Sequence, residues 1–303
     1  MKTLNIILPA IESESDLLKK NLSRLLERLE WVGIPNYRVF VIFQMKSNVP
    51  PDLGGPYPPE VRIIPVSFHS VSRARNLGLS MVPLDADHFV YFLDCDAVPS
   101  DGFLKMVKWV LEFDVPFARG RVLWGGEESG FPPGGSHDAS PRKRVHPMWR
   151  VAKHYLWIHI IRGDMLSGIR FNERIGPGEA TPLKSGEDVL YYYQIVKRNR
   201  LTEFMDFPDG HVYHPERPAE FSKELLYARG QGAMYRHLIF DLGLPRGAWI
   251  GVALLFALFL GNAFFRAATF RRNGFGILKE RLRGILNGDL QGYFETPSNE
   301  EMR

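Results

Sequence analysis

The segment Phe89-Val90-Tyr91-Phe92-Leu93-Asp94-Cys95-Asp96 decides the fold class of this chain. Its unbroken apolar run is typical of a strand that is buried on both faces of a parallel sheet. The run leads directly into two aspartates, and in open α/β sheets ligands bind beyond the carboxyl ends of the strands. The segment therefore predicts a buried strand, with Asp94 and Asp96 at the functional edge of an α/β sheet.

Strand-like and helix-like stretches alternate upstream of that segment. Leucines recur at spacings of four and three from Leu18 to Val32, which marks one helical face, and Gly33 ends the pattern. This βαβ rhythm predicts a doubly wound α/β sheet with helices on both faces. The expected elements are strands at Asn5–Pro9, Tyr37–Phe43, Val61–Val66 and Phe89–Leu93, and helices over Leu18–Val32 and Ser72–Met81.

Composition narrows the class of protein. The chain has 303 residues, of which 45% are hydrophobic and 13% aromatic, and this excludes wholesale disorder, collagen and coiled coils. A net charge of +4 is too small by itself to indicate binding to nucleic acid, and we expect none, but it favours anionic partners such as diphosphates or lipid headgroups. The single cysteine, Cys95, rules out an intrachain disulfide. The apolar stretch Leu4–Pro9 is too short for a secretory signal, so we expect a cytoplasmic catalytic domain.

Asp94 and Asp96 are the strongest chemical signal. Carboxylates two positions apart on an extended segment point the same way, and Mg²⁺ and Mn²⁺ prefer carboxylate oxygens and often share a site with substrate phosphates. The alternative is a polar turn after a strand, where aspartate is frequent. Haloacid-dehalogenase-type hydrolases also use Asp-x-Asp after a strand, but near the N-terminus.

A second signal is Ser185-Gly186-Glu187-Asp188, which precedes an expected helix over Val189–Asn199. Ser185 and Asp188 have the spacing of a capping box, which alone could explain both residues. An aspartate at a helix start is also held ionised by the helix dipole, which suits a catalytic base. Capping does not explain Glu187.

A third signal is His211-Val212-Tyr213-His214. Alternation along a strand would place the two histidines on opposite faces, so only one of them can face a site. The alternative for His214 is a structural hydrogen bond rather than a metal ligand.

In this order the pieces resemble an inverting glycosyltransferase of family 2, with the GT-A fold, over about residues 3–240. The matching motifs are the strand that ends at Pro9, Ser72-Arg-Ala-Arg-Asn76-Leu-Gly78, Asp94-x-Asp96, Phe171-Asn-Glu-Arg174-Ile-Gly176, Gly186-Glu187-Asp188 and the late Val-Tyr-His214. The resemblance implies a mixed GT-A sheet with helices on both faces.

The resemblance also implies roles for individual residues. Asp96, Asp94 and His214 would bind a divalent metal, Mn²⁺ or Mg²⁺. Asp188 would be the catalytic base, with Glu187 assisting acceptor binding. The residues expected to contact the nucleotide-sugar are Pro9, Ala10, Glu12, Gln44, Arg75, Asn76, Asp94, Cys95 and Arg229.

The chain departs from the family pattern after its second strand. Many relatives have Asp-Asp-Gly-Ser there, whereas this chain has Phe43-Gln44-Met45-Lys46. The amide of Gln44 can still hydrogen-bond a uracil edge, so a UDP-sugar remains the expected donor. The Gln-x-x-Arg-Trp motif of processive synthases is incomplete at Gln231–Tyr235, which favours addition of a single sugar in surface polysaccharide synthesis.

The sequence leaves two alternative functions open. A GT-A-like nucleotidyltransferase would need a glycine-rich basic loop after the first strand, but Pro9–Asp16 is acidic. A membrane-associated scaffold that binds a nucleotide-sugar without catalysis is the alternative from another class. The presence of Asp94, Asp96 and Asp188 argues against it.

The C-terminal part has a different composition. We expect a glycosyltransferase domain over residues 1–242 and helices that associate with a membrane over 243–303. Ala248–Phe265 is apolar except for Asn262, and Arg266–Arg283 carries six basic residues and one acidic one. Phe275, Leu278, Leu282 and Ile285 form a stripe typical of interfacial helices. We expect attachment to the inner face of a membrane; a buried core helix is the alternative. The long loop Gly125–Pro147 is expected to be functional.

Overall fold

The computed structural model describes residues 2–46, 53, 55–125, 143–145, 155–179, 181–215, 221–244, 246–269 and 273–288. The chain divides into two compact units. Unit 1 comprises residues 1–147, 155–167 and 201–218, and unit 2 comprises residues 148–154, 168–200 and 219–303. Most of the long loop Gly125–Pro147, which is expected to be functional, lies outside the described residues.

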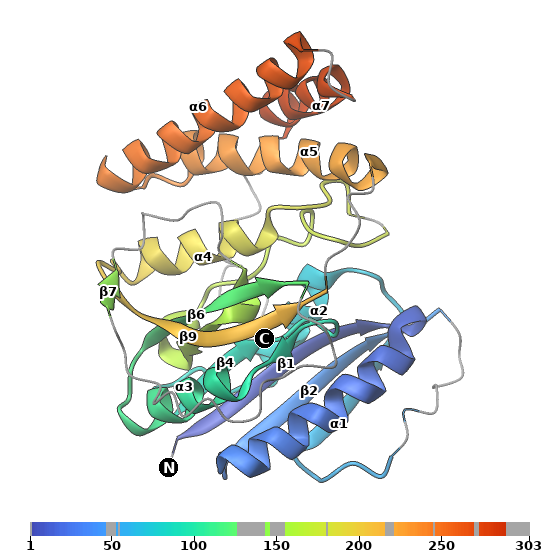
Figure 1. The fold of residues 1–303 in the computed structure, drawn as a ribbon, viewed down its shortest axis with the longest axis vertical. Coiled ribbons are helices and arrows are strands. Elements are labelled where there is room, and N and C mark those ends of the chain that lie inside the picture. The colour runs from blue at the N-terminus through green and yellow to red at the C-terminus, as the bar shows by residue number, and fades with distance from the viewer. Residues whose placement is uncertain are drawn as a thin grey trace, which may run out of the picture. The chain divides into compact units, whose positions relative to one another are not determined.

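Unit 1 contains a nine-stranded mixed sheet (Figure 1). Its order is β3-β2-β1-β4-β8-β6-β9-β5, with β7 paired to β9. The first four strands are parallel neighbours, and β8 joins β4 antiparallel. The expected α/β sheet is therefore confirmed. The strands are β1 Thr3–Ile11, β2 Tyr37–Gln44, β3 Val61–Val66, β4 His88–Phe92, β5 Val98–Pro99, β6 Phe117–Trp124, β7 Lys143–Val145, β8 His159–Arg162 and β9 Phe204–His214.

Helices cover both faces of this sheet, as the sequence predicts. Leu4, Ile6 and Leu8 of β1 share one core with the apolar faces of α1 and α3. Ile7 instead packs against Gly78 of α2, where a Cβ would lie 2.5 Å from the Ile7 Cγ2. Because successive residues of a strand point to opposite faces, α2 lies across the sheet from α1 and α3. The helices of unit 1 are α1 Ser15–Val32, α2 Val71–Ser80 and α3 Asp101–Glu112, with 3₁₀ turns at Glu12–Glu14, Leu156–Ile158 and Gly163–Leu166.

Helix α1 forms and ends as its sequence pattern predicts. Leu18, Leu22, Leu25, Leu29 and Val32 are all buried. Gly33 follows in the left-handed region with φ of 73°, and its N–H caps the last turn by bonding to the carbonyl oxygens of Glu30 and Leu29. A glycine adopts this conformation without steric cost, which fixes the end of the helix.

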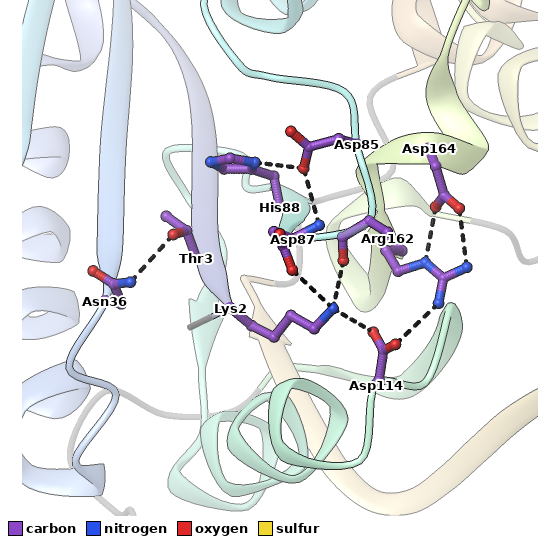
Figure 2. Close-up of polar contacts among 10 residues, drawn as sticks. Lys2, Thr3, Asn36, Asp85, Asp87, His88, Asp114, Arg162 and Asp164 are labelled. Atoms are coloured by element: carbon purple, nitrogen blue, oxygen red, sulfur yellow. Dashed lines mark hydrogen bonds and ion pairs between the residues drawn. The ribbon is translucent and has the colours of Figure 1, made fainter.

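The amino ends of β1 and β4 are tied by ion pairs (Figure 2). Lys2 Nζ lies 3.2 Å from both Asp87 Oδ1 and Asp114 Oδ1. Arg162 contacts Asp114 at 3.4 Å and Asp164 at 2.9 Å. In parallel strands this edge is opposite the one that carries Asp94 and Asp96, so the network is separate from the candidate site.

Unit 2 is helical over most of its described length. Its elements are α4 Glu187–Arg198, α5 Phe221–Arg236, the π-helical turn η5 His237–Asp241, α6 Arg246–Ala268 and α7 Gly274–Asn287. Helices α5 and α7 approach closely at two glycines. A Cβ on Gly232 would collide with the Arg281 carbonyl, and one on Gly284 with the Arg229 carbonyl. The expected C-terminal helices are thus present, while a functional boundary at residues 242/243 stays a prediction.

Helix α6 contains the one described helical segment that could cross a membrane by length and composition. That segment is Trp249–Ala268, with 20 residues, and 17% of its most apolar window is buried. Low burial distinguishes it from a core helix of a water-soluble domain, which packs on most sides.

Candidate functional site

The carboxyl ends of β1, β2 and β4 gather several of the residues that the sequence singles out. Pro9 pairs with Ile42 and Ala10 with Phe43, so β1 and β2 end side by side. Glu12 follows β1 and accepts a hydrogen bond from the Lys46 backbone N–H at 3.0 Å. Asp94 and Asp96 follow β4, the other parallel neighbour of β1. The predicted functional edge is therefore assembled within unit 1.

Asp94 is held by a buried arginine. Nη2 of Arg75, whose side chain is only 2% exposed, donates to Asp94 Oδ1 at 2.9 Å, while the Asp94 side chain keeps 31% of its surface exposed. A charge-assisted bond of this kind is short and directional. Arg75 therefore positions Asp94. Its guanidinium lies at the expected nucleotide-binding edge, where it contacts this carboxylate.

The side chain of Gln44 helps to position the helix that carries Arg75. Its Oε1 accepts the backbone N–H of Ser70 at 2.6 Å, and its Nε2 donates to the Ala10 carbonyl at 3.4 Å. Ser70 is the N-cap of α2, because its Oγ accepts the Arg73 N–H. The buried Gln44 amide thus fixes the start of the helix that carries Arg75. The amide that we expected to meet a uracil edge contacts the protein backbone in this structure.

Asp96 and His214 meet although they come from distant parts of the sequence. His214 Nε2 lies 3.4 Å from Asp96 Oδ1, and both side chains are largely buried. The pairing of β5 with β9, Val98 opposite Tyr213, brings the two segments together. His214 Nδ1 lies 3.0 Å from the Pro215 carbonyl, which leaves Nε2 directed at Asp96. The sequence predicted that these two residues share a site, and the structure brings them together.

Two tryptophans pack against the His214 ring, and neither is predicted from the sequence. The ring centroids of Trp124 and Trp157 lie 4.9 and 5.2 Å from that of His214. Tyr155 stacks on Trp157 at 5.2 Å and meets Trp124 edge-on. Trp124 is half exposed, whereas Trp157 is buried. The only sequence signal was the density of aromatics at Trp124 and Tyr155–Trp157, on both sides of the long loop.

These contacts test the expected metal site. Within the described ranges, no group of three or more His, Cys, Asp or Glu side chains lies close enough to hold a metal ion. Asp94 contributes its Oδ1 to Arg75, so the expected three-ligand set is not assembled. Asp96 and His214 do fit two adjacent positions of one ion, because neighbouring ligands of an octahedral Mg²⁺ lie about 3 Å apart. Such ions commonly take few protein ligands and complete their shell with phosphate and water.

Cys95 and Asn76, both expected to contact the nucleotide-sugar, lie in different surroundings. The Cys95 side chain is buried in the core, and its Sγ donates to Glu14 Oε2 at 2.8 Å. Its carbonyl accepts from Asn21 Nδ2 at 2.8 Å. Through these bonds Cys95 helps to hold the turn that carries Asp94 and Asp96. Asn76 lies half-buried on α2, directly after Arg75.

The remaining candidates belong to unit 2. Glu187 and Asp188 occupy the first turn of α4, half-buried, and Arg229 is an exposed residue of α5. The capping box that the spacing of Ser185 and Asp188 allows does not form: the N-cap is Gly186, with φ of 106°, and no side chain caps the helix. Ser185 Oγ instead donates to the Tyr227 carbonyl at 2.9 Å. Asp188 is therefore not needed as a cap, while its place in the first turn still keeps its carboxylate beside the positive end of the helix dipole.

Comparison with solved structures identifies the fold. Staphylococcus aureus TarS 1–349 in complex with UDP-GlcNAc matches 94% of this chain and 82% of its own, at a TM-score of 0.61 and 16% identity. GalNAc-T7 with UDP, GalNAc and Mn²⁺ matches 83% of this chain and 54% of its own, at a TM-score of 0.50 and 11% identity. No family model matches the chain. No curated protein sequence matches it. The likeness in structure, together with the mixed sheet, shows that the chain has the GT-A glycosyltransferase fold.

Proposed function

We propose that this protein is a metal-dependent inverting glycosyltransferase, similar to family 2, that moves one sugar from a nucleotide-sugar to a hydroxyl group. The observation that carries the proposal is the Asp96–His214 pair at the carboxyl edge of a GT-A sheet, with Asp94 held beside it by Arg75. The nucleotides named with TarS and GalNAc-T7, UDP-GlcNAc and UDP, favour a UDP-sugar as donor.

The donor diphosphate would lie beside Asp96 and His214. These two side chains would hold Mn²⁺ or Mg²⁺, which supplies positive charge to the departing nucleoside diphosphate. Asp94 would accept hydrogen bonds from the donor while Arg75 fixes its orientation. The end of β1 and the turn after it, at Pro9–Glu12, would contact the nucleobase, while the buried Gln44 would hold the start of α2.

Asp188 would act on the acceptor. Its carboxylate takes the proton of the acceptor hydroxyl as that oxygen bonds to the anomeric carbon, and the bond from this carbon to the diphosphate oxygen breaks. Attack from the face opposite the leaving group inverts the anomeric centre. Glu187 would bind the acceptor, and Arg229 would stabilise the negative charge on the leaving group.

The acceptor would be a growing glycan or a lipid-linked intermediate of surface polysaccharide synthesis. A lipid-linked acceptor requires the enzyme to work at a membrane. The apolar helix α6 and the basic residues around α7 support a position at the cytoplasmic face, by peripheral or monotopic attachment.

Thermal unfolding with UDP, GDP and CDP, each with and without Mn²⁺, tests the donor site. A nucleotide at 100 times its Kd stabilises the native state by about 2.7 kcal/mol, which raises Tm by about 4 °C for a chain of this size. We expect a Mn²⁺-dependent rise with UDP that Asp96→Ala abolishes. Asp87→Ala, on the opposite edge of the sheet, is the matched control and should keep the rise. No rise with any nucleotide would contradict the proposal.

A further inference from the structure

Helix α6 is apolar on two faces. One face packs inside unit 2: Val252, Ala263 and Ala267 are buried, and Phe256 and Phe259 contact the ring of Tyr235. The other face points outward, and its large side chains are 54–69% exposed. They are Ile250, Leu254, Leu258, Phe264 and Phe265. An outward helix face in water ordinarily carries polar side chains, so this face, called here the outer face, fits an apolar surrounding.

Arg281 of α7 binds the middle of α6. Its Nη1 donates to the Phe259 carbonyl at 2.6 Å, and its guanidinium carbon lies 3.7 Å from the Phe259 ring centroid. Phe259 is about 15 Å from Trp249 and about 13 Å from Ala268 along the helix, at about 1.5 Å per residue. The charge of Arg281 is thus fixed near the centre of the segment that is long enough to span a membrane.

This contact decides between crossing a membrane and lying on it. If α6 spanned the roughly 30 Å hydrocarbon core, Phe259 would sit near the midplane and bring the Arg281 guanidinium with it. A charged side chain at that depth is strongly unfavourable. A second charged pair opposes a spanning helix. Arg266 pairs with the exposed Glu224 of α5 at 3.0 Å, which ties α6 to a helix that carries an acidic residue at its surface.

We infer that α6 lies in the plane of an anionic membrane surface, with its outer face among the acyl chains, and does not cross the bilayer. Helix α7 supports this placement, because Phe275, Leu282 and Leu286 are exposed on it beside the exposed Lys279 and Arg283. Apolar and basic side chains together are what an anionic interface binds. The inference sharpens the membrane attachment in the proposed function and does not depend on the transfer reaction.

Co-sedimentation of the full chain with vesicles tests the outer face. We expect binding to vesicles of phosphatidylcholine and phosphatidylglycerol, and weaker binding to phosphatidylcholine alone. Leu254→Glu/Leu258→Glu should lower the bound fraction about tenfold or more, because two inserted side chains become charged. Phe113→Glu in unit 1, equally exposed in the wild type, is the matched control and should bind normally. No vesicle binding by the wild type, or a dimer that the double variant abolishes instead, would overturn the inference.

Depth measurements separate an in-plane helix from a spanning one. Single cysteines at Ile250, Leu258 and Phe265 would carry a fluorescent label, with the wild type and its buried Cys95 as labelling blank. Lipids spin-labelled at different acyl depths should quench all three labels at one shallow depth. Quenching that is deepest at position 258 and shallow at 250 and 265 would establish a spanning helix. The UDP-dependent rise in Tm is measured without lipid, so failure here leaves the donor-site test unaffected.

Discussion

Nε2 of His214 lies 3.4 Å from Oδ1 of Asp96, and the two side chains are joined by the pairing of β5 with β9. Neither segment alone forms the candidate metal site. Asp96 lies in the turn between β4 and β5, two residues before β5, and His214 is the last residue of β9. The antiparallel pairing of β5 with β9 therefore brings the carboxylate and the imidazole together.

The Asp96–His214 pair should act as a unit in donor binding. We expect Asp96→Asn and His214→Gln each to abolish the Mn²⁺-dependent part of UDP binding, because each removes one of two protein ligands. The double variant should lose little more than either single variant, so the free energies deviate from additivity by about 0.5–3 kcal/mol. Titration calorimetry with UDP and Mn²⁺ measures this. Additive losses would show that the two residues bind independently.

Trp124 should influence the metal through His214. Its ring centroid lies 4.9 Å from that of His214, and half of its surface is exposed, so Trp124→Leu should spare the fold. Groups that orient a metal ligand typically change metal affinity by about 10–100-fold when altered. We expect a loss in that range for Mn²⁺ in the presence of UDP. Trp31→Leu, an exposed tryptophan of α1, is the control and should leave the affinity unchanged.

The Arg75–Asp94 pair should be asymmetric in its effect on stability. Asp94→Asn leaves the charge of Arg75 in a buried position, and removing one partner of a buried pair typically costs about 3–5 kcal/mol. Arg75→Met leaves an Asp94 carboxylate that is 31% exposed and can be solvated, so its cost should be smaller. Urea unfolding of both variants measures the order. A larger loss for Arg75→Met would contradict this account of the pair.

The local parts of the fold could be predicted from the sequence. The helix over Leu18–Val32 and the strand Val61–Val66 follow from hydrophobic periodicity and strand propensity, and the structure confirms both. The edge position of Asp94 and Asp96 follows from the run of apolar residues before them. These features depend on residues that are close in the sequence, so a local sequence pattern predicts them.

The contacts that build the site could not be predicted in the same way. The clamp of Trp124 and Trp157 on His214 joins residues from β6, a 3₁₀ turn and β9, and no local pattern records such a meeting. The capping box that the spacing of Ser185 and Asp188 allows is absent for a related reason. Ser185 donates to the Tyr227 carbonyl on another helix, and this tertiary contact prevails over the local one.

Stability should fall in mild acid because of His159. Burial, and then the nearby charge of Arg119, lower the pKa of His159 to about 3 from its ordinary value of 6.5. Between these values the unfolded chain binds a proton that the native protein does not. This contribution to stability is full above pH 6.5 and is lost as pH falls toward 3, by up to about 1.4 kcal/mol per pH unit. Urea unfolding from pH 7 to pH 4 should show a shallower decline in His159→Phe. An equal decline would exclude this cause.

Asp188→Asn tests the proposed base. The substitution keeps the size and hydrogen-bonding shape of the side chain but removes its ability to accept a proton. General-base catalysis contributes about 10²–10⁴-fold, so kcat with a hydroxyl acceptor should fall by that factor. The UDP-dependent rise in Tm should persist, because donor binding is assigned to Asp94, Asp96 and His214. Glu173→Gln, another acidic residue of unit 2 and outside the proposed machinery, is the matched control and should keep most activity. Near-normal turnover of Asp188→Asn would move the base elsewhere, whereas loss of the Tm rise would assign Asp188 to donor binding.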